Sequence, residues 1–291
     1  MRHGLRLIFM VPALIVLISL GKHPAAYALV PPDYVPAGPG DIYMALGDSL
    51  ATGTEYPGNN DNLPGYPAML LAHAQNINPA LGYENLAING ETSSSMLAAG
   101  GQLDTAIARI QEVGAAGKRV GLVTVSIGGN DAVSILFPGG DEPAEVLATF
   151  ETNFATILDR LQPALKDDNG VVQGDLLVME LYNPYPGLPL LGIGELADEW
   201  VPKFNASIRS IAADRGIPVA EVGTAFVGNE AGYIFVERPY PDSPLDPELL
   251  RKLDYHPRQA GHQAIADGLF AVSGYTPAAP DGWVSLPGVV Q

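Results

Sequence analysis

The sequence predicts an α/β fold, a parallel sheet with helices on both faces, and three observations support this prediction. Five strand-like runs alternate with helix-like segments from residue 41 onward, an order typical of parallel strands joined by helical crossovers. Residues 120–127 form a continuous β-branched apolar run, as expected for a strand buried on both faces. No internal repeat or linker divides the chain, so we expect one domain over residues 41–275.

Local patterns locate the individual elements. Residues 103–113 place apolar side chains three and four positions apart, which is the spacing of one helix face. Pro143 suits the first position of a long helix, and Pro202 is expected to interrupt another helix that Gly216 ends. The predicted strands are 42–46, 85–88, 120–127, 176–181 and 218–222, and the predicted helices are 66–75, 103–113, 143–165, 196–215 and 258–272.

The N-terminus has the pattern of an export signal. Arg2 and Arg6 precede an uncharged apolar run at 7–20, and small residues follow up to an Ala-Tyr-Ala ending at Ala28. This pattern predicts a cleavable secretory signal at 1–28, because the apolar run is shorter than the ~20 residues of a membrane span. An uncleaved N-terminal anchor is the alternative. We expect a secreted, extracytoplasmic protein without a stable membrane span after cleavage.

Two further segments flank the predicted domain. Residues 29–40 are rich in proline and glycine and are expected to form an extended leader, and residues 276–291 are expected to form a C-terminal tail.

Composition excludes several classes of function. The chain has no cysteine, which excludes disulfides, thiolate metal sites and a cysteine nucleophile. Its net charge is −17, and the segment up to Ala28 contributes three basic and no acidic residues, so the remainder carries −20. Such a charge opposes binding to nucleic acids and to anionic membranes, and no nucleic-acid partner is expected.

Polar and small residues follow the predicted strands where a site is expected. Gly47-Asp48-Ser49-Leu50 follows the first strand, Gly90 the second, and Gly128-Gly129-Asn130-Asp131 the third, while His256 comes late in the chain. Ligands bind beyond the carboxyl ends of parallel strands, so these groups are expected to share one edge. Ester hydrolysis needs these types of residue: a hydroxyl nucleophile, an imidazole base and donors for an oxyanion.

In this combination the sequence resembles the GDSL, or SGNH, hydrolase superfamily. The motifs named above, together with His256-Pro257 and Ala260-Gly261-His262, follow the order of that family from residue 47 to 262. The resemblance implies a three-layer α/β/α fold with a flavodoxin-like five-stranded parallel sheet. It also implies serine-dependent hydrolysis of a small-molecule or lipid ester, without a metal or another cofactor.

The resemblance also implies a role for each motif residue. Ser49 would be the nucleophile, and its backbone N–H would form an oxyanion hole with the backbone N–H of Gly90 and the side chain of Asn130. His256 would take the serine proton and return it to the leaving alkoxide. We interpret Asp48 as a structural turn residue.

The residue that orients His256 is left open by the sequence. Family members commonly carry an aspartate three residues before the histidine, but Leu253 stands at that position. Asp254, two residues before His256, is the candidate acid, and a backbone carbonyl is the alternative.

Function is predicted at two levels. The chemistry indicates a secreted esterase or lipase that forms an acyl-enzyme on Ser49 and takes part in lipid degradation. A deacetylase of cell-wall or plant polysaccharides would use the same residues, and a non-catalytic surface-binding domain would retain only the fold. Residues 188–194 either line an acyl pocket or pack in the core. The run at 58–62 is interpreted as a turn rather than a calcium loop.

Overall fold

A six-stranded sheet forms the centre of the protein. The computed structural model describes residues 28–54, 59, 64–136 and 139–276, so most of the predicted signal peptide and C-terminal tail lie outside the described residues. The strands are β1 (Ala28–Leu29), β2 (Ile42–Gly47), β3 (Gly82–Asn85), β4 (Val120–Ser126), β5 (Asp175–Met179) and β6 (Val219–Ala220). Their spatial order is β1-β6-β5-β4-β2-β3, and all neighbours are parallel except β1 and β6. The five parallel strands follow the flavodoxin-like order.

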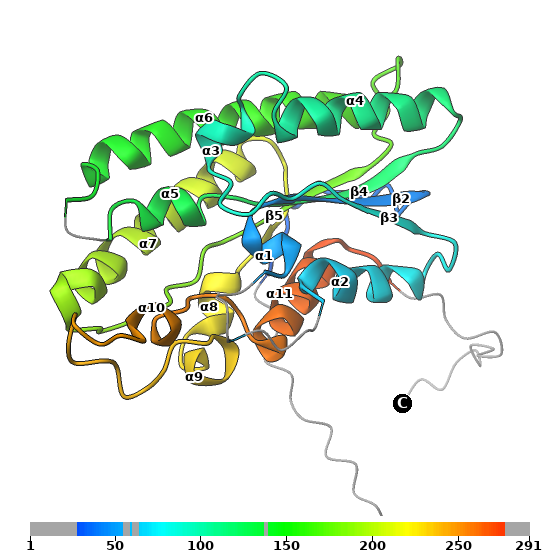
Figure 1. Ribbon diagram of the computed structural model, residues 1–291. Coiled ribbons are helices and arrows are strands. Elements are labelled where there is room, and N and C mark those ends of the chain that lie inside the picture. Colours follow the sequence, from blue (N-terminus) through cyan, green and yellow to red (C-terminus); the bar gives the residue numbers. More distant parts are fainter. Residues whose placement is uncertain (1–27, 55–58, 60–63, 137–138, 277–291) are drawn as a thin grey trace, which may run out of the picture.

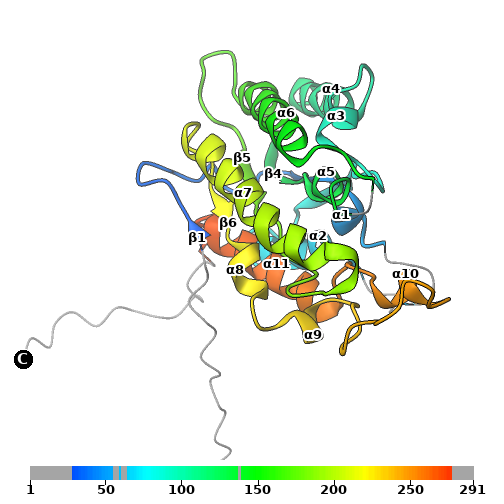
Figure 2. The same cartoon turned by 90° about the vertical axis from the view of Figure 1, so that its left-hand side faces the viewer.

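Helices cover both faces of this sheet. They are α1 (Ser49–Thr52), α2 (Tyr66–Gln75), α3 (Ser93–Met96), α4 (Gln102–Ala115), α5 (Gly129–Val133), α6 (Pro143–Ala164), the short 3-10 helix η1 (Leu190–Gly192), α7 (Ile193–Ala213), α8 (Val222–Phe226), α9 (Glu230–Tyr233), α10 (Leu249–Lys252) and α11 (Gln259–Val272). α4 and α6 lie on one side of the strands, and α2 and α11 lie on the other (Figures 1 and 2). The predicted three-layer α/β/α fold is therefore confirmed.

Burial explains why these segments adopt these structures. Every residue of β4 is buried, which accounts for the unbroken apolar run in the sequence. The buried residues of α4 recur at helical spacing and include Leu103, Ala106 and Ile110. One polar contact crosses the sheet core, where the hydroxyls of Tyr43 and Thr124 are 2.8 Å apart.

Three predicted elements differ from the structure, and one is the fifth strand, predicted at 218–222, which is limited to Val219–Ala220 because Val222 begins α8. The second parallel strand, β3, begins at Gly82, three residues earlier than predicted, because this edge strand is only half-buried and lacks an apolar pattern. α7 continues through Pro202 without a break, contrary to the prediction. Pro202 is exposed, whereas Val201 and Phe204 are buried, so packing of the apolar face keeps the helix intact.

The predicted leader contacts the sheet through its backbone. Leu29 pairs with Val219 in the antiparallel β1–β6 ladder. Farther along, the N–H groups of Ala37 and Gly38 donate to the buried carboxylate of Asp175 at 2.9 and 3.1 Å.

Among the described residues, no helix combines the length and the apolar character that crossing a membrane requires.

Candidate active site

The turn after β2 places Ser49 at the carboxyl edge of the sheet. Gly47 has a φ of +134°, and a Cβ at this position would come within 2.1 Å of the Ser126 carbonyl oxygen, so only glycine fits. Asp48 then caps α1, because its carboxylate accepts the N–H of Leu50 at 3.0 Å. Ser49 is the first residue of α1, which directs its N–H outward from the helix.

The structure brings Ser49, His256 and Asp254 into one hydrogen-bonded chain. His256 Nε2 is 2.8 Å from Ser49 Oγ, and His256 Nδ1 is 2.6 Å from Asp254 Oδ1. The serine and the histidine are 207 residues apart in the sequence. A nucleophile, a base and an acid in this order form the arrangement that activates a serine.

Asp254 is almost fully buried, with an exposed fraction of 3%. Its Oδ2 accepts a hydrogen bond from Asn59 Nδ2 at 3.0 Å, and the same amide nitrogen donates to the Arg251 carbonyl oxygen at 2.9 Å. Burial by itself would raise the pKa of Asp254, but the hydrogen bonds from His256 and Asn59 lower it below its ordinary value. Asp254 is therefore held as a carboxylate.

The sequence did not indicate Asn59 as a site residue. It belongs to the run at 58–62 interpreted as a turn, of which only Asn59 is among the described residues. It lies 195 positions from Asp254 in the chain, and nothing in the local pattern signals their contact.

Two tyrosine hydroxyls fix the loop that carries His256. Tyr182 donates to the Tyr255 carbonyl oxygen and Tyr185 donates to the Leu253 carbonyl oxygen, each at 2.7 Å. The Tyr255 ring also stacks on His256, with ring centroids 4.6 Å apart. The two hydrogen bonds hold the backbone before His256 in place, and the stacked ring restricts the orientation of the imidazole.

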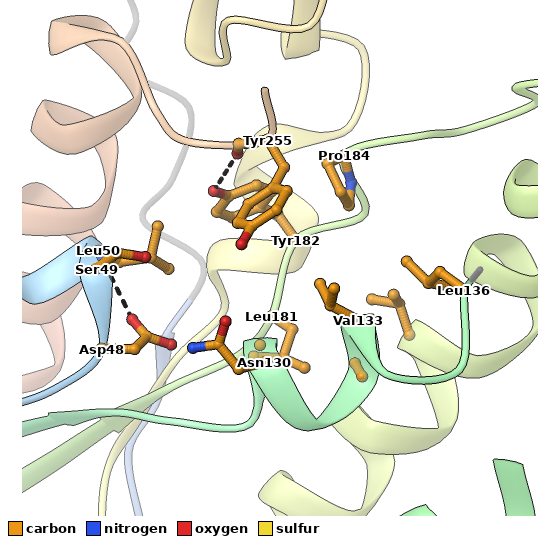
Figure 3. A pocket seen from close by; sticks show the side chains of 13 residues that line it. Asp48, Ser49, Leu50, Asn130, Val133, Leu136, Leu181, Tyr182, Pro184 and Tyr255 are labelled. Carbon is orange, nitrogen blue, oxygen red and sulfur yellow. Dashed lines mark hydrogen bonds between the residues drawn. The ribbon is translucent and has the colours of Figure 1, made fainter. Parts of the chain in front are cut away.

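Asn130 and Gly90 converge on the same edge. Asn130 Nδ2 donates to the Glu91 carbonyl oxygen at 2.8 Å, which fixes the amide and leaves its second N–H available. Figure 3 shows the Asn130 side chain extending from α5 towards Asp48 and Ser49. Gly90 lies in a turn with φ of +76°. Among the described residues, no acceptor engages the backbone N–H of Gly90 or of Ser49.

Asp48 is buried beside Ser49, with an exposed fraction of 3%. Burial raises the pKa of Asp48 to about 7, although the hydrogen bond from Leu50 and the proximity of His256 partly oppose this shift. Its hydrogen bond with Leu50 is that of a helix cap, so Asp48 has a structural contact at the start of a helix, whereas the sequence predicts a structural turn residue.

An apolar pocket opens next to Ser49 (Figure 3). The space between its lining residues is about 530 Å³ when the part open to solvent is included, and the space that water-sized molecules can occupy is about 50 Å³. Its lining residues come from the turn that carries Ser49, α5 and the residues just after it, the segment after β5, α7, and the loop that carries His256: Asp48, Ser49, Leu50, Gly129, Asn130, Ala132, Val133, Leu136, Leu181, Tyr182, Pro184, Val201 and Tyr255.

Residues 188–194 do not line this pocket, although the sequence left that possibility open. Leu188, Leu190 and Ile193 are buried in the core instead.

Among the residues that the structure describes, no group of three or more histidine, aspartate or glutamate side chains is arranged to hold a metal ion.

Comparison with known proteins agrees with the motifs. The model of the GDSL-like lipase/acylhydrolase family matches residues 45–264. The spore germination lipase LipC of Bacillus licheniformis is 26% identical over 133 residues, which cover 43% of this chain and 58% of the lipase. The chain thus spans less than two thirds of this curated relative.

Solved structures share the fold. The lipase Lip_vut3 from a goat rumen metagenome is 22% identical with a TM-score of 0.59, covering 81% of this chain and 98% of that one. The acetylxylan esterase Axe2 of Geobacillus stearothermophilus is 21% identical with a TM-score of 0.50, covering 84% and 100%. Because the family match spans most of the sequence, and as its motifs predicted, this chain belongs to the GDSL-like lipase/acylhydrolase family, a family of serine ester hydrolases.

Proposed function

We propose that this protein is an exported serine esterase or lipase that cleaves carboxylic esters through an acyl-enzyme on Ser49. The observation that carries the proposal is the continuous hydrogen-bonded chain from Asp254 through His256 to Ser49, at 2.6 and 2.8 Å. A serine hydroxyl is a weak nucleophile at its own pKa, and a base at hydrogen-bond distance activates it.

The first half of the reaction forms the acyl-enzyme. His256 Nε2 takes the proton from Ser49 Oγ as this oxygen attacks the ester carbonyl carbon, while Asp254 stabilises the imidazolium. The negative charge moves to the carbonyl oxygen, where the N–H groups of Ser49, Gly90 and Asn130 stabilise it. When the tetrahedral intermediate collapses, the C–O bond breaks and His256 gives its proton to the leaving alkoxide.

The second half releases the acid. A water molecule takes the place of the alcohol. The water attacks the acyl carbon while His256 takes one proton from the water. Collapse of the second intermediate returns the proton to Ser49 Oγ and frees the carboxylic acid.

The pocket beside Ser49 supports an apolar acyl group. Val133, Leu136 and Val201 belong to its lining, and such walls favour hydrocarbon over a sugar ring. The name of the LipC relative agrees with this choice. We therefore favour an esterase or lipase, active in lipid degradation, over a polysaccharide deacetylase.

Covalent labelling tests the assignment of the nucleophile. A fluorophosphonate probe should label the wild-type protein at Ser49, and Ser49→Ala should abolish labelling and lower kcat by about 10³ or more. Ser210→Ala, which changes an exposed serine on α7, is the matched control. A folded Ser49→Ala variant that is still labelled would show another nucleophile, and a wild-type protein without labelling or turnover would favour the binding-domain alternative.

Export is part of the proposal and has its own test. The segment 1–28 is proposed to be removed, which leaves Leu29 as the first residue. Intact-mass measurement of the protein recovered from the extracytoplasmic fraction should give the mass of residues 29–291. Recovery of the full-length chain with membranes would instead indicate the uncleaved anchor.

A further inference from the structure

A buried pair of polar side chains, Gln102 and Glu91, lies directly behind the candidate oxyanion hole. Their exposed fractions are 2% and 4%. Gln102 is the first residue of α4, and Glu91 follows Gly90 in the loop after β3. Neither residue belongs to the hydrogen-bonded chain that carries the proposed reaction.

Gln102 clamps the backbone of the nucleophile turn from both sides. Its Oε1 accepts the N–H of Gly47 at 2.6 Å, and its Nε2 donates to the Gly47 carbonyl oxygen at 2.9 Å. That carbonyl oxygen also accepts the N–H of Ile88 at 3.0 Å, which joins the ends of β2 and β3. The clamp therefore acts two residues before Ser49 and close to Gly90.

Glu91 continues the network towards the other two donors. Its Oε2 accepts from Gln102 Nε2 at 2.9 Å, and its Oε1 accepts from the hydroxyl of Ser95. The backbone carbonyl of the same residue holds Asn130 Nδ2 at 2.8 Å. Glu91 is thus fixed by its side chain while its backbone positions the Asn130 amide and is covalently joined to Gly90.

Burying the carboxyl group of a glutamate costs free energy that burying an apolar side chain does not. Among the described residues Glu91 forms no ion pair with lysine or arginine, so hydrogen bonds alone compensate its burial. An apolar residue at this place would fill the volume but could not tie α4 to the loop after β3. The network fits a positioning role better than a packing role.

We propose that Gln102 and Glu91 are positioning residues that hold the donors of Ser49, Gly90 and Asn130 in one fixed geometry. The inference rests on the proposed function, because it assigns these donors to an oxyanion. Donors aimed in advance at the developing charge stabilise the transition state, and small displacements weaken them. Loss of the pair should therefore lower kcat with little effect on ground-state binding.

Gln102→Leu tests the clamp, with Thr105→Ala as the control from the same helix. Thr105 is exposed, and its hydroxyl donates to the carbonyl oxygen of Gly101, which caps the same helix. Gln102→Leu should lower kcat on a nitrophenyl butyrate by about 10- to 100-fold, part of the 10²–10³ lost when an oxyanion donor is removed. KM should stay within about threefold. A kcat within about threefold of the control would overturn the proposal.

Glu91 provides a second pair of variants in case Gln102→Leu does not fold. Glu91→Gln can still accept from Gln102 with its amide oxygen and donate to Ser95 Oγ with its amide nitrogen, whereas Glu91→Leu can do neither. We expect Glu91→Gln to keep a kcat at least about fivefold above that of Glu91→Leu at matched thermal stability. Equal kcat values would contradict a role for these hydrogen bonds.

A double-mutant cycle distinguishes positioning from general destabilisation. If Gln102 acts partly through Asn130, then Gln102→Leu should lower kcat at least about threefold less in an Asn130→Ala background than in the wild type. Independent, multiplicative losses would contradict the coupling. Failure of the proposed function itself would look different, because the wild-type protein would then show no Ser49-dependent labelling or turnover.

Discussion

Asp254 Oδ1 accepts two hydrogen bonds from the same residue, one from Nδ1 of His256 at 2.6 Å and one from its backbone N–H at 3.1 Å. The second bond closes an Asx-turn, in which an aspartate side chain binds the N–H two residues on. This turn lets an aspartate only two positions before the histidine reach the ring. Leu253, at the more usual position of the acid, is buried in the hydrophobic core, and its carbonyl oxygen accepts the hydroxyl of Tyr185.

Asp254→Asn should lower kcat by as much as ~10⁴ while the fold is retained, the scale known for replacing the triad carboxylate by an amide. An amide oxygen at the Oδ1 position can still accept the backbone N–H of His256, so the turn should survive, but it carries no charge to stabilise the imidazolium. Steady-state kinetics with circular dichroism of the same preparation would check both expectations.

Asp242→Asn serves as the control for Asp254→Asn, because Asp242 is an exposed carboxylate in the same part of the chain. Its kcat should stay close to wild type. A loss of less than about tenfold in Asp254→Asn would mean that the carboxylate is not required and that a Ser–His pair suffices.

Asn130→Ala tests the oxyanion role of the side-chain donor. We expect kcat to fall by roughly 10²–10³ with little change in KM, because the N–H acts on charge that exists only in the transition state. Asn229→Ala, an asparagine exposed at α9, is a suitable control. A change confined to KM would make Asn130 a substrate-binding residue instead.

The fold was largely predictable because its signals are local and strong. The apolar run that became β4 and the periodic face of α4 both follow from spacing in the sequence. The start of the edge strand β3 and the effect of Pro202 on α7 were predicted wrongly. Tertiary packing decides both, and a local sequence pattern does not contain it. Helices of four or five residues, such as α1 and α5, are too short to leave a periodic signal.

The site was predictable where motifs mark it and not where distant contacts make it. Ser49 and His256 stand out through their sequence blocks, and the structure places them within 2.8 Å of each other. Asn59, Gln102 and Glu91 could not be inferred, because each acts through contacts to another segment of the chain.

The apolar pocket predicts a preference for acyl chains longer than acetate. Each buried methylene contributes about 0.8 kcal/mol, so kcat/KM should rise with chain length on nitrophenyl esters until the pocket is filled. Val133→Trp should reduce the available space and lower kcat/KM for the octanoate by about tenfold or more, with a smaller effect on the acetate.

Val172→Trp is the matched control for the pocket variant, because Val172 is an exposed valine that does not line the pocket. It should leave the chain-length profile unchanged. A wild-type enzyme most active on acetyl esters, with an additional preference for acetylated xylan, would instead support the deacetylase reading.

Because Asp48 is buried, we expect its contribution to the free energy of unfolding to fall as the pH rises. Burial raises the pKa of Asp48 to about 7, whereas an aspartate in the unfolded chain has a pKa of about 3.9. Between these two values the folded state binds more protons than the unfolded state, so its contribution to the free energy of unfolding decreases with pH. This contribution is fully present below about pH 4 and is lost as the pH passes about 7.

Asp48→Asn should remove that dependence, because its amide oxygen can still accept the Leu50 N–H but carries no charge to desolvate. Urea unfolding at a series of pH values should show the variant gaining on the wild type by a few kcal/mol between about pH 4 and 7, then running parallel to it. Asp214→Asn, an exposed aspartate at the end of α7, controls for the loss of one charge. A constant difference between Asp48→Asn and the wild type across this range would show that Asp48 is already ionised in the folded protein at low pH.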